Sequence, residues 1–388
     1  MIYVSKPSIV SAPGMSADEN ILNLQTGKRF LTLCDSFIEG KSFMLGKIGV
    51  GFEKFSSKTP EHFKTRTNAL ALNAMMQIDN TIKDAIKKHG KNRVGVVIGT
   101  TTSGVEENYK IFKEHAKTGF FDIFRYNVSQ NALANPAEFI ADFYGLSGVC
   151  FAVSTACTSG VKAIIEAKRL IKAGICDAVI CGGVDSLNTL TINGFHSLGI
   201  LSESETNPFS KNRDGINIGE GAGLFVLSKD EISDIVIVGE HSNCDAFHMT
   251  QPETSGKMQG ICIQEALKKA NLSKVDYINL HGTGTIANDQ VEAAVVNANL
   301  PNTPASSIKP AIGHTLGAAG AIESAICVML CMQKEVILPP HIYDGIYDKE
   351  IKRVNLVKIN EKAVVNSAMS LSFAFGGDNA AIIFERVR

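Results

Sequence analysis

The amino-acid sequence predicts an α/β protein made of two similar halves, with helices layered around sheets. Three observations predict this fold class. Short apolar runs rich in β-branched residues alternate with stretches of helical periodicity, a charged segment from Ser228 to Asp234 separates two such series, and each series holds one long helix of small and apolar residues. We therefore expect an N-terminal half at 1–229 and a C-terminal half at 230–388.

The predicted strands are continuous apolar runs, which are typical of strands buried on both faces of a sheet. These runs are Arg93 to Gly99, Asp177 to Gly183, Asp234 to Val238, Tyr277 to Leu280 and Asn379 to Phe384.

Helical spacing of apolar residues predicts helices over Asn68 to Lys88, Thr158 to Ala173 and Gly260 to Ala270. The longest apolar stretch, Leu316 to Met332, is shorter than the roughly 20 residues that span a bilayer and carries a glutamate near its middle, so we expect a buried helix and no membrane span. The two buried helices begin after Cys157 and after His314. This arrangement would bring one reactive residue from each half to a central site.

Composition narrows the class of partner and the compartment. The 388 residues are 45% hydrophobic and carry a formal net charge of -1, which gives no general attraction for nucleic acid. The amino terminus lacks the features of a secretory signal, so we expect a cytoplasmic protein. Its nine cysteines are scattered and odd in number, which indicates reduced thiols rather than a disulfide framework. No spacing predicts a metal site or a cofactor.

Three residues carry the chemistry that the sequence suggests. Cys157 lies in Ser154 to Gly160 (STACTSG), where a helix start and small neighbours suit an activated nucleophile. Because a helix start is partly positive, we expect the thiolate to be favoured over the thiol. His281 and His314 follow a strand end and precede a helix, and together they can donate hydrogen bonds to one developing oxyanion. Taken singly, each of the three is more often a structural residue, and only their combination is specific.

Near the carboxyl end, Phe373 to Asn379 (FAFGGDN) sets a glycine pair beside two aromatic rings, just before the last predicted strand. The segment is either a moving gate or a tight turn with core phenylalanines.

Four motifs, taken in chain order, resemble those of the elongating β-ketoacyl-acyl-carrier-protein synthases, condensing enzymes of the thiolase superfamily. They are STACTSG (154–160), HGTGT (281–285), KPAIGH with LGAAGAIES (309–314 and 316–324) and FAFGGDN (373–379). The resemblance implies a five-layered αβαβα fold, a dimer of identical or related chains, and decarboxylative Claisen condensation in fatty acid or polyene and polyketide elongation.

The resemblance also implies a role for individual residues. Cys157 takes the acyl chain from carrier protein, His281 and His314 stabilise the enolate formed from malonyl-carrier protein, and the N–H groups of Cys157 and Phe375 form an oxyanion hole. Further assignments are support by Lys309 and Glu323, pantetheine binding by Thr283 and Thr285, an acyl gate at Phe375 with Phe373 beside it, and carrier-protein docking by Lys64, Arg66 and Arg125.

The chain departs from the family pattern at Leu371, Ala374 and Asp378, where asparagine, glycine and threonine are expected. These changes leave open both the behaviour of the gate and the presence of a monovalent cation, although Asn279, Glu323 and Ser324 remain. The rival functions are a starter-unit condensing enzyme, a thiolase, and a non-catalytic chain-length partner subunit. The first two pair the cysteine with His/Asn or His/Cys, and the last lacks the nucleophile, whereas this chain has Cys157 and two motif histidines.

Overall fold

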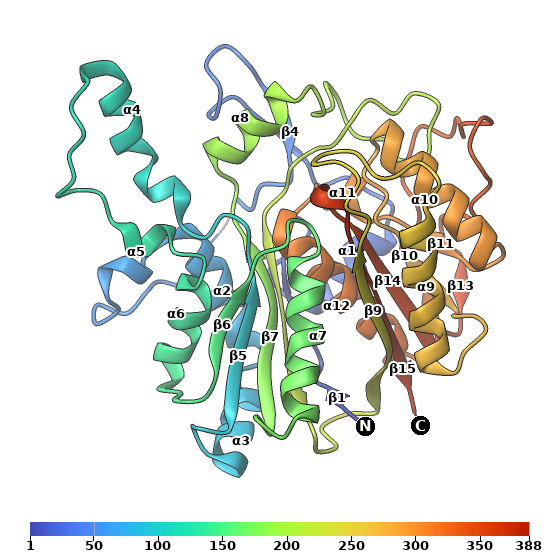
Figure 1. The fold of residues 1–388 in the computed structure, drawn as a ribbon, viewed down its shortest axis with the longest axis horizontal. Helices are drawn as coiled ribbons and strands as arrows, with labels where there is room; N and C mark the ends of the chain where they lie inside the picture. Colours follow the sequence, from blue (N-terminus) through green and yellow to red (C-terminus); the bar gives the residue numbers. More distant parts are fainter. Residues whose placement is uncertain (50, 388) are drawn as a thin grey trace.

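The computed structural model describes residues 1–49 and 51–387, and within these ranges eleven strands form one hydrogen-bonded sheet (Figure 1). From one edge to the other the strands are β6 (Cys150–Val153), β5 (Val94–Gly99), β7 (Ala178–Asp185), β8 (Gly221–Ser228), β1 (Tyr3–Val4), β9 (Ile235–Cys244), β15 (Asp378–Arg386), β14 (Ser367–Phe373), β10 (Tyr277–Asn279) and β11 (Ala305–Ser306), with β2 (Ser8–Val10) paired to β8. Two small hairpins lie apart from it, β3 (Thr32–Cys34) with β4 (Phe43–Leu45) and β12 (Val336–Ile337) with β13 (Lys362–Ala363).

The two halves of the sheet mirror each other in strand direction. In the first half, β6, β5 and β7 run parallel and β8 is antiparallel to β7. In the second half, β11, β10 and β14 run parallel and β15 is antiparallel to β14. The short strand β1 joins the halves because it pairs with both β8 and β9.

Helices form three layers around these two halves. Helices α7 (Ser159–Lys172) and α12 (Ala319–Cys331) pack against each other and contact strands of both halves. Outside the first half lie α2 (Arg66–Gln77), α3 (Asp79–His89) and α6 (Asn135–Tyr144), and outside the second lie α9 (Lys257–Ala270) and α10 (Ile286–Asn299) (Figure 1). The order of layers is therefore αβαβα.

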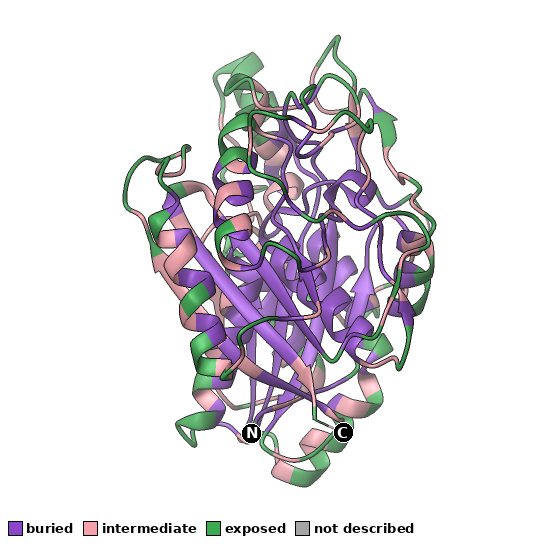
Figure 2. Ribbon diagram, turned by 90° about the vertical axis from the view of Figure 1, so that its right-hand side faces the viewer, coloured by how far each residue is buried: buried purple, intermediate pink, exposed green. Residues whose placement is uncertain are grey.

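Alternate residues of the strands fill separate cores, because side chains of a strand point to opposite faces. On β15, Ala380, Ile382 and Phe384 pack with α7 and α12, whereas Ala381 and Ile383 pack with α9 and α10. Both faces are apolar, which explains why the sequence shows continuous apolar runs. Figure 2 shows the buried strands and the exposed outer faces of the covering helices.

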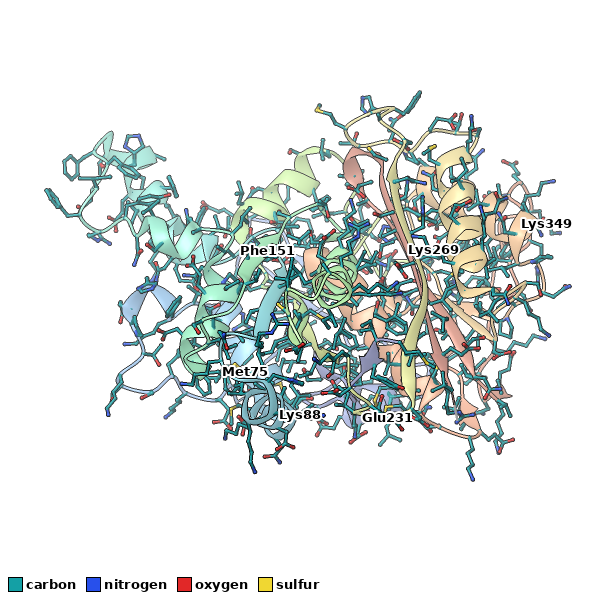
Figure 3. All side chains as sticks on the ribbon, turned by 60° about the horizontal axis from the view of Figure 1, so that its bottom comes forward. Met75, Lys88, Phe151, Glu231, Lys269 and Lys349 are labelled. Carbon is teal, nitrogen blue, oxygen red and sulfur yellow. The ribbon has the colours of Figure 1, made fainter. Side chains whose placement is uncertain are left out.

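Charged side chains lie on those outer faces, as for Lys88 on α3 and Lys269 on α9 (Figure 3). The central helix α12 is buried along its whole length. No helix among residues 1–49 and 51–387 is long and apolar enough to cross a membrane.

The strands expected from the sequence are present, but one expected helix is wrong. The stretch from Asn68 to Lys88 is two helices, α2 and α3, separated at Ile78, whose ψ of 16° leaves the helical range. Ile78 is buried in the core outside the first half, so burial of this side chain fixes the break. The stretch beginning at Leu316 starts as a 3₁₀ turn, Leu316–Ala318, before α12.

The remaining helices are α1 (Ala17–Gln25), α4 (Tyr109–Thr118), α5 (Val128–Asn131), α8 (Thr189–Ser197) and the wholly buried α11 (Lys309–Ile312), with 3₁₀ turns at Glu61–Phe63, Val105–Asn108 and Phe375–Gly377. The segment from α4 to α5 extends away from the body (Figure 1). Its exposed apolar residues include Phe120, Ile123, Phe124 and Val128, and Phe124 is 98% exposed.

Candidate active site

Cys157 stands on a strained turn between β6 and α7. Ala156 has φ of 51°, a left-handed conformation that is uncommon for a residue with a side chain. Hydrogen bonds within the turn hold it, since Thr158 Oγ1 donates to the Thr155 carbonyl over 2.6 Å and Ser159 Oγ donates to the Ala156 carbonyl over 2.6 Å. The turn presents the cysteine at the start of the central helix.

His281 follows β10, and a carboxylate from the next helix holds its backbone. The two oxygens of Glu292, on α10, accept the N–H groups of His281 over 2.6 Å and of Gly282 over 2.7 Å. Burial raises the pKa of Glu292 to about 7.

His314 lies between α11 and the turn that begins α12. The ring Nδ1 of His314 accepts the backbone N–H of Leu316 over 3.1 Å. The backbone N–H of His314 donates to the Asn217 carbonyl over 2.7 Å. A neutral imidazole has one N–H. Because Nδ1 accepts the hydrogen bond from Leu316, the ring proton of His314 is on Nε2.

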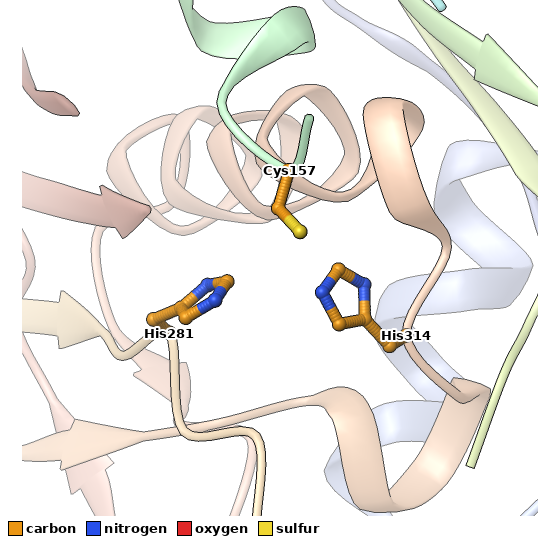
Figure 4. Close-up of side chains that lie close together, drawn as sticks. All are labelled: Cys157, His281 and His314. Carbon is orange, nitrogen blue, oxygen red and sulfur yellow. The ribbon is translucent and has the colours of Figure 1, made fainter. Parts of the chain in front are cut away.

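These three residues meet although they come from distant parts of the chain. The sulfur of Cys157 and one ring nitrogen of each histidine all lie within 4.8 Å of one another. The two rings are nearly perpendicular, with centroids 5.5 Å apart, and the sulfur points between them (Figure 4). The structure therefore brings together the three residues that the sequence suggested.

The same three atoms form the one cluster of His, Cys, Asp and Glu in the described ranges that is close enough to hold a metal ion. Thiolate and imidazole are ligands that suit Zn²⁺. The positive charge of Lys309 nearby disfavours a second cation here. The absence of a resident metal stays a prediction.

Lys309 and Glu323 form a buried ion pair behind His281. Their side chains are 2% and 1% exposed. The Lys309 ammonium also donates to the His281 carbonyl over 2.5 Å and lies 3.4 Å from His281 Nδ1. Because an ammonium only donates, its position leaves the proton of His281 on Nε2. Both histidines therefore offer an Nε2–H group.

The electrostatics of the site favour neutral groups. Burial, the charge of Lys309 and the neighbouring His314 hold the pKa of His281 well below its usual value, and burial and Lys309 do the same for His314. Burial also raises the pKa of Cys157 to about 12, although Lys309 and the N–H of Phe375 oppose the shift. The expected preference for thiolate is thus wrong, because loss of hydration outweighs the helix start.

The backbone N–H groups of Phe375 and Cys157 lie near the sulfur, where each lowers the pKa of the thiol against the effect of burial. Two preorganised donors at a nucleophile are the arrangement that stabilises an oxyanion on a carbonyl bound there.

Two cavities meet at Cys157. One, of about 310 Å³, is lined by both histidines, Thr283, Thr285 and Phe373. The other, of about 510 Å³, is lined by Thr101, Thr102, Ala156 and residues of α8. Four residues line both cavities, namely Cys157, Phe195, Leu198 and Phe375. The ring of Phe375 packs on Phe195 with centroids 5.7 Å apart, so these rings stand between the two spaces.

The three expected docking residues lie outside these cavities. Lys64 pairs with Glu61 and Arg125 pairs with Glu114 on the surface. Arg66 is bound by the buried carboxylate of Glu220 and its side chain is 31% exposed. None of the three lines either cavity.

Two supporting carboxylates were not expected from the sequence: Asp185 and the Glu292 described above. The carboxylate of Asp185, at the end of β7, accepts the hydroxyls of Thr100, Thr101 and Thr102 and the N–H of Gly317. It thereby ties the wall of the larger cavity to the turn after His314. For Asp185, the only local signal in the sequence was an acidic residue at the end of an otherwise apolar strand. For Glu292, which binds the backbone N–H of His281, it was an acidic residue within a helix of small residues.

Comparisons with known proteins agree with this geometry. Residues 50–232 match the family model described as "Beta-ketoacyl synthase, N-terminal domain", and residues 235–343 match "Beta-ketoacyl synthase, C-terminal domain". A putative mitochondrial 3-oxoacyl-[acyl-carrier-protein] synthase of Schizosaccharomyces pombe is 34% identical over 81% of this chain and 80% of its own length. The 3-oxoacyl-[acyl-carrier-protein] synthase 2 of Vibrio cholerae is 32% identical over 78% of each chain.

Solved structures show the same fold. The Xenorhabdus doucetiae ketosynthase ApeO, in complex with its chain length factor ApeC, superimposes with a TM-score of 0.91 at 35% identity, covering 99% of this chain and 98% of that chain. A β-ketoacyl synthase from Burkholderia phymatum gives a TM-score of 0.87 at 25% identity, covering 100% and 99%. The thiolase-like five-layered fold expected from the motifs is confirmed.

Proposed function

The chain belongs to the β-ketoacyl synthase family, and we propose that it is a condensing acyltransferase whose nucleophile is Cys157. The observation that carries the proposal is the meeting of the Cys157 sulfur with two neutral histidines at the junction of two cavities. The substrates are an acyl thioester and malonyl-carrier protein, in fatty acid or polyene and polyketide elongation.

In the first half-reaction, the Cys157 sulfur attacks the acyl thioester carbonyl. The carbon–sulfur bond to pantetheine breaks, and the thiol proton of Cys157 ends on the departing pantetheine sulfur. Since the pKa of Cys157 is about 12, the proton leaves as the new bond forms rather than beforehand. The N–H groups of Cys157 and Phe375 bind the tetrahedral oxyanion.

In the second half-reaction, carbon dioxide leaves the malonyl group and its bonding electrons form an enolate. The Nε2–H groups of His281 and His314 stabilise the enolate oxygen, and Lys309 with Glu323 holds His281 in the required tautomer. The enolate carbon attacks the acyl group on Cys157, and the expelled sulfur takes up one proton from solvent. Neutral histidines suit this role because they donate without delivering a proton to the carbanion.

Each cavity then has its own ligand. We assign the smaller cavity to the pantetheine arm, with Thr283 and Thr285 as hydrogen-bonding residues and Phe373 as an apolar wall, and the larger one to the acyl chain. Phe375, which lines both, is the gate between them. Lys64, Arg66 and Arg125 would meet the acidic carrier protein, Arg66 through the exposed third of its side chain.

A second subunit, identical or related, would cover the segment from α4 to α5, because its exposed apolar side chains are more than a free surface normally shows. We retain the division of the chain into an N-terminal half at 1–229 and a C-terminal half at 230–388. The expected compartment is the cytoplasm, and the nine free cysteines suit a reducing environment.

Intact-mass analysis after incubation with acyl-carrier proteins tests the proposal. The wild-type chain should gain one acyl group, which peptide mapping places on Cys157. Cys157→Ala should gain none but should still release carbon dioxide from malonyl-carrier protein, because the histidines form the enolate independently of the sulfur. Acylation of the alanine variant, or a wild-type chain that stays unmodified by a competent donor, would contradict the proposal.

A further inference from the structure

An ion pair joins the turn at Phe375 to the helix that carries the nucleophile. Asp378, the first residue of β15, places Oδ2 2.5 Å from Lys162 Nζ on α7, and each side chain is 19% exposed. The backbone of Asp378 also closes the turn, since its carbonyl accepts the N–H of Ala374 over 2.7 Å.

Lys162 is the strongest partner of this carboxylate. Burial raises the pKa of Asp378, and the hydrogen bond and charge of Lys162, with a smaller effect of Thr158, oppose the shift. The second oxygen, Oδ1, is buried without a hydrogen bond among the described residues. A half-buried carboxylate so placed depends on its single cation.

The other side of the turn is held by backbone hydrogen bonds, by a thiol and by the side chain of Asn379, whose Nδ2 donates to the Gly377 carbonyl over 3.0 Å. The N–H of Gly376 donates to the Met249 carbonyl over 2.8 Å, the Gly377 carbonyl accepts the N–H of Asp245 over 2.8 Å, and Cys244 Sγ donates to the Gly376 carbonyl over 3.3 Å. Gly376 and Gly377 have φ of 84° and 75°. The turn can therefore change shape at its glycines, while the ion pair fixes its far end to α7.

This fixed end matters because Phe375 has two tasks. Its ring lies between the two cavities, and its backbone N–H lies beside Cys157 at the point where they meet. An oxyanion donor works only if its distance to the reacting carbonyl is held closely, and a shift of about 1 Å costs up to roughly a hundredfold in rate. Lys162 lies on the same helix as the nucleophile, so the pair sets the turn relative to Cys157.

We propose that Asp378 and Lys162 are positioning residues that hold the N–H of Phe375 against the acyl group on Cys157. This inference rests on the proposed function and adds to it. It separates the two partial reactions: acyl transfer needs the Phe375 N–H, whereas malonyl decarboxylation needs only the two histidines.

The experiment measures both partial reactions in the full chain, purified with any subunit that accompanies it. Asp378→Asn and Lys162→Met each remove one charge at nearly constant volume. Each should slow acyl transfer to Cys157 about tenfold or more and leave decarboxylation of malonyl-carrier protein within twofold. The double variant should lose no more than either single one, because both remove the same interaction. The exchanged pair, Lys162→Asp with Asp378→Lys, should recover part of the rate.

Lys168→Met supplies the matched control. Lys168 lies on the same helix and forms an ion pair with Glu240 on β9, which is more deeply buried than the tested pair and lies away from the turn. The Lys168→Met variant should lower the thermal midpoint as the test variants do, but it should not show their selective loss of acyl transfer.

The outcomes are distinct. Equal loss of both partial reactions in Asp378→Asn, unchanged acyl transfer, or additive losses in the double variant would overturn the inference. If Asp378→Asn does not fold, Lys162→Met and the exchanged pair decide the question by the same criteria. A wild-type chain that accepts no acyl group would instead remove the proposed function.

Discussion

The backbone N–H of Leu316 donates to Nδ1 of His314 over 3.1 Å, and so turns the Nε2–H of this ring toward Cys157. The helix start itself thus selects the tautomer, since Leu316 begins the turn that leads into α12. The Lys309 ammonium does the same for His281. Two neutral donors facing one point are suited to an oxygen that becomes negative during the reaction.

His314→Ala should therefore lower malonyl decarboxylation by about 10²- to 10³-fold, the usual cost of one oxyanion donor, and change acylation of Cys157 only a few-fold. Release of carbon dioxide and intact-mass acylation report the two steps separately. His314→Gln, whose amide N–H reaches nearly as far, should retain more decarboxylation than the alanine variant. Comparable losses in both steps would contradict this division of labour.

The three residues of the candidate site could be predicted because their local patterns occur together in one chain: a small-residue turn before a helix at Cys157, and glycines beside His281 and His314. The carboxylates that hold the site could not. Asp185 acts on threonines about 85 positions earlier and on Gly317 far later in the chain, as only the fold shows. In the same way, the break at Ile78 depends on a tertiary core rather than on helical periodicity.

The layered fold was predictable for a related reason. Buried strands and buried helices are both continuously apolar, and both appear in the sequence. Electrostatics were not predictable to the same degree. A helix start alone favours a thiolate, but the depth of Cys157, with 8% exposure, reverses the preference.

Alkylation of Cys157 should show this reversal. With a pKa of about 12, the thiolate fraction rises about tenfold for each pH unit, so the rate of alkylation by iodoacetamide should keep rising from pH 7 to pH 10. Peptide mass spectrometry can follow the modified peptide, with glutathione as a reference thiol whose rate levels off near its ordinary pKa. A plateau for Cys157 between pH 7 and 8 would show that the thiolate is stabilised after all.

The buried pair of Lys309 and Glu323 should have a large effect on stability when only one partner is removed. Lys309→Met leaves an unpaired carboxylate in the core and should lower the free energy of unfolding by about 3–5 kcal/mol. The double variant Lys309→Met with Glu323→Leu replaces the pair by apolar groups and should regain most of that loss. Urea unfolding measures both.

The double variant also separates stability from chemistry. Without Lys309, His281 Nδ1 has no other hydrogen-bond partner among residues 1–49 and 51–387 to select the tautomer, so decarboxylation should stay reduced although the fold is restored. Recovery of full decarboxylation would show that the ion pair serves the fold alone.

Gly377 should tolerate no side chain, and its neighbour provides the comparison. A Cβ at Gly377 would lie 1.7 Å from Asp245 Oδ1, whereas a Cβ at Gly376 meets nothing within 4 Å; both residues have positive φ, 75° and 84°. Gly376→Ala adds only backbone strain, about 1–2 kcal/mol. Gly377→Ala adds a clash that Asp245 cannot avoid freely, because its carboxylate accepts the N–H groups of Phe247 and Glu253.

We expect Gly377→Ala to displace the turn that holds Phe375 and to slow acyl transfer by more than tenfold, with a clearly smaller loss in Gly376→Ala. Stopped-flow kinetics compare the rate of acylation in the two variants, and their thermal midpoints are measured alongside. Adding Asp245→Gly to Gly377→Ala removes the clashing carboxylate and should restore part of the rate. If the two alanine variants lose acyl transfer equally, strain at the glycines rather than contact with Asp245 limits the turn.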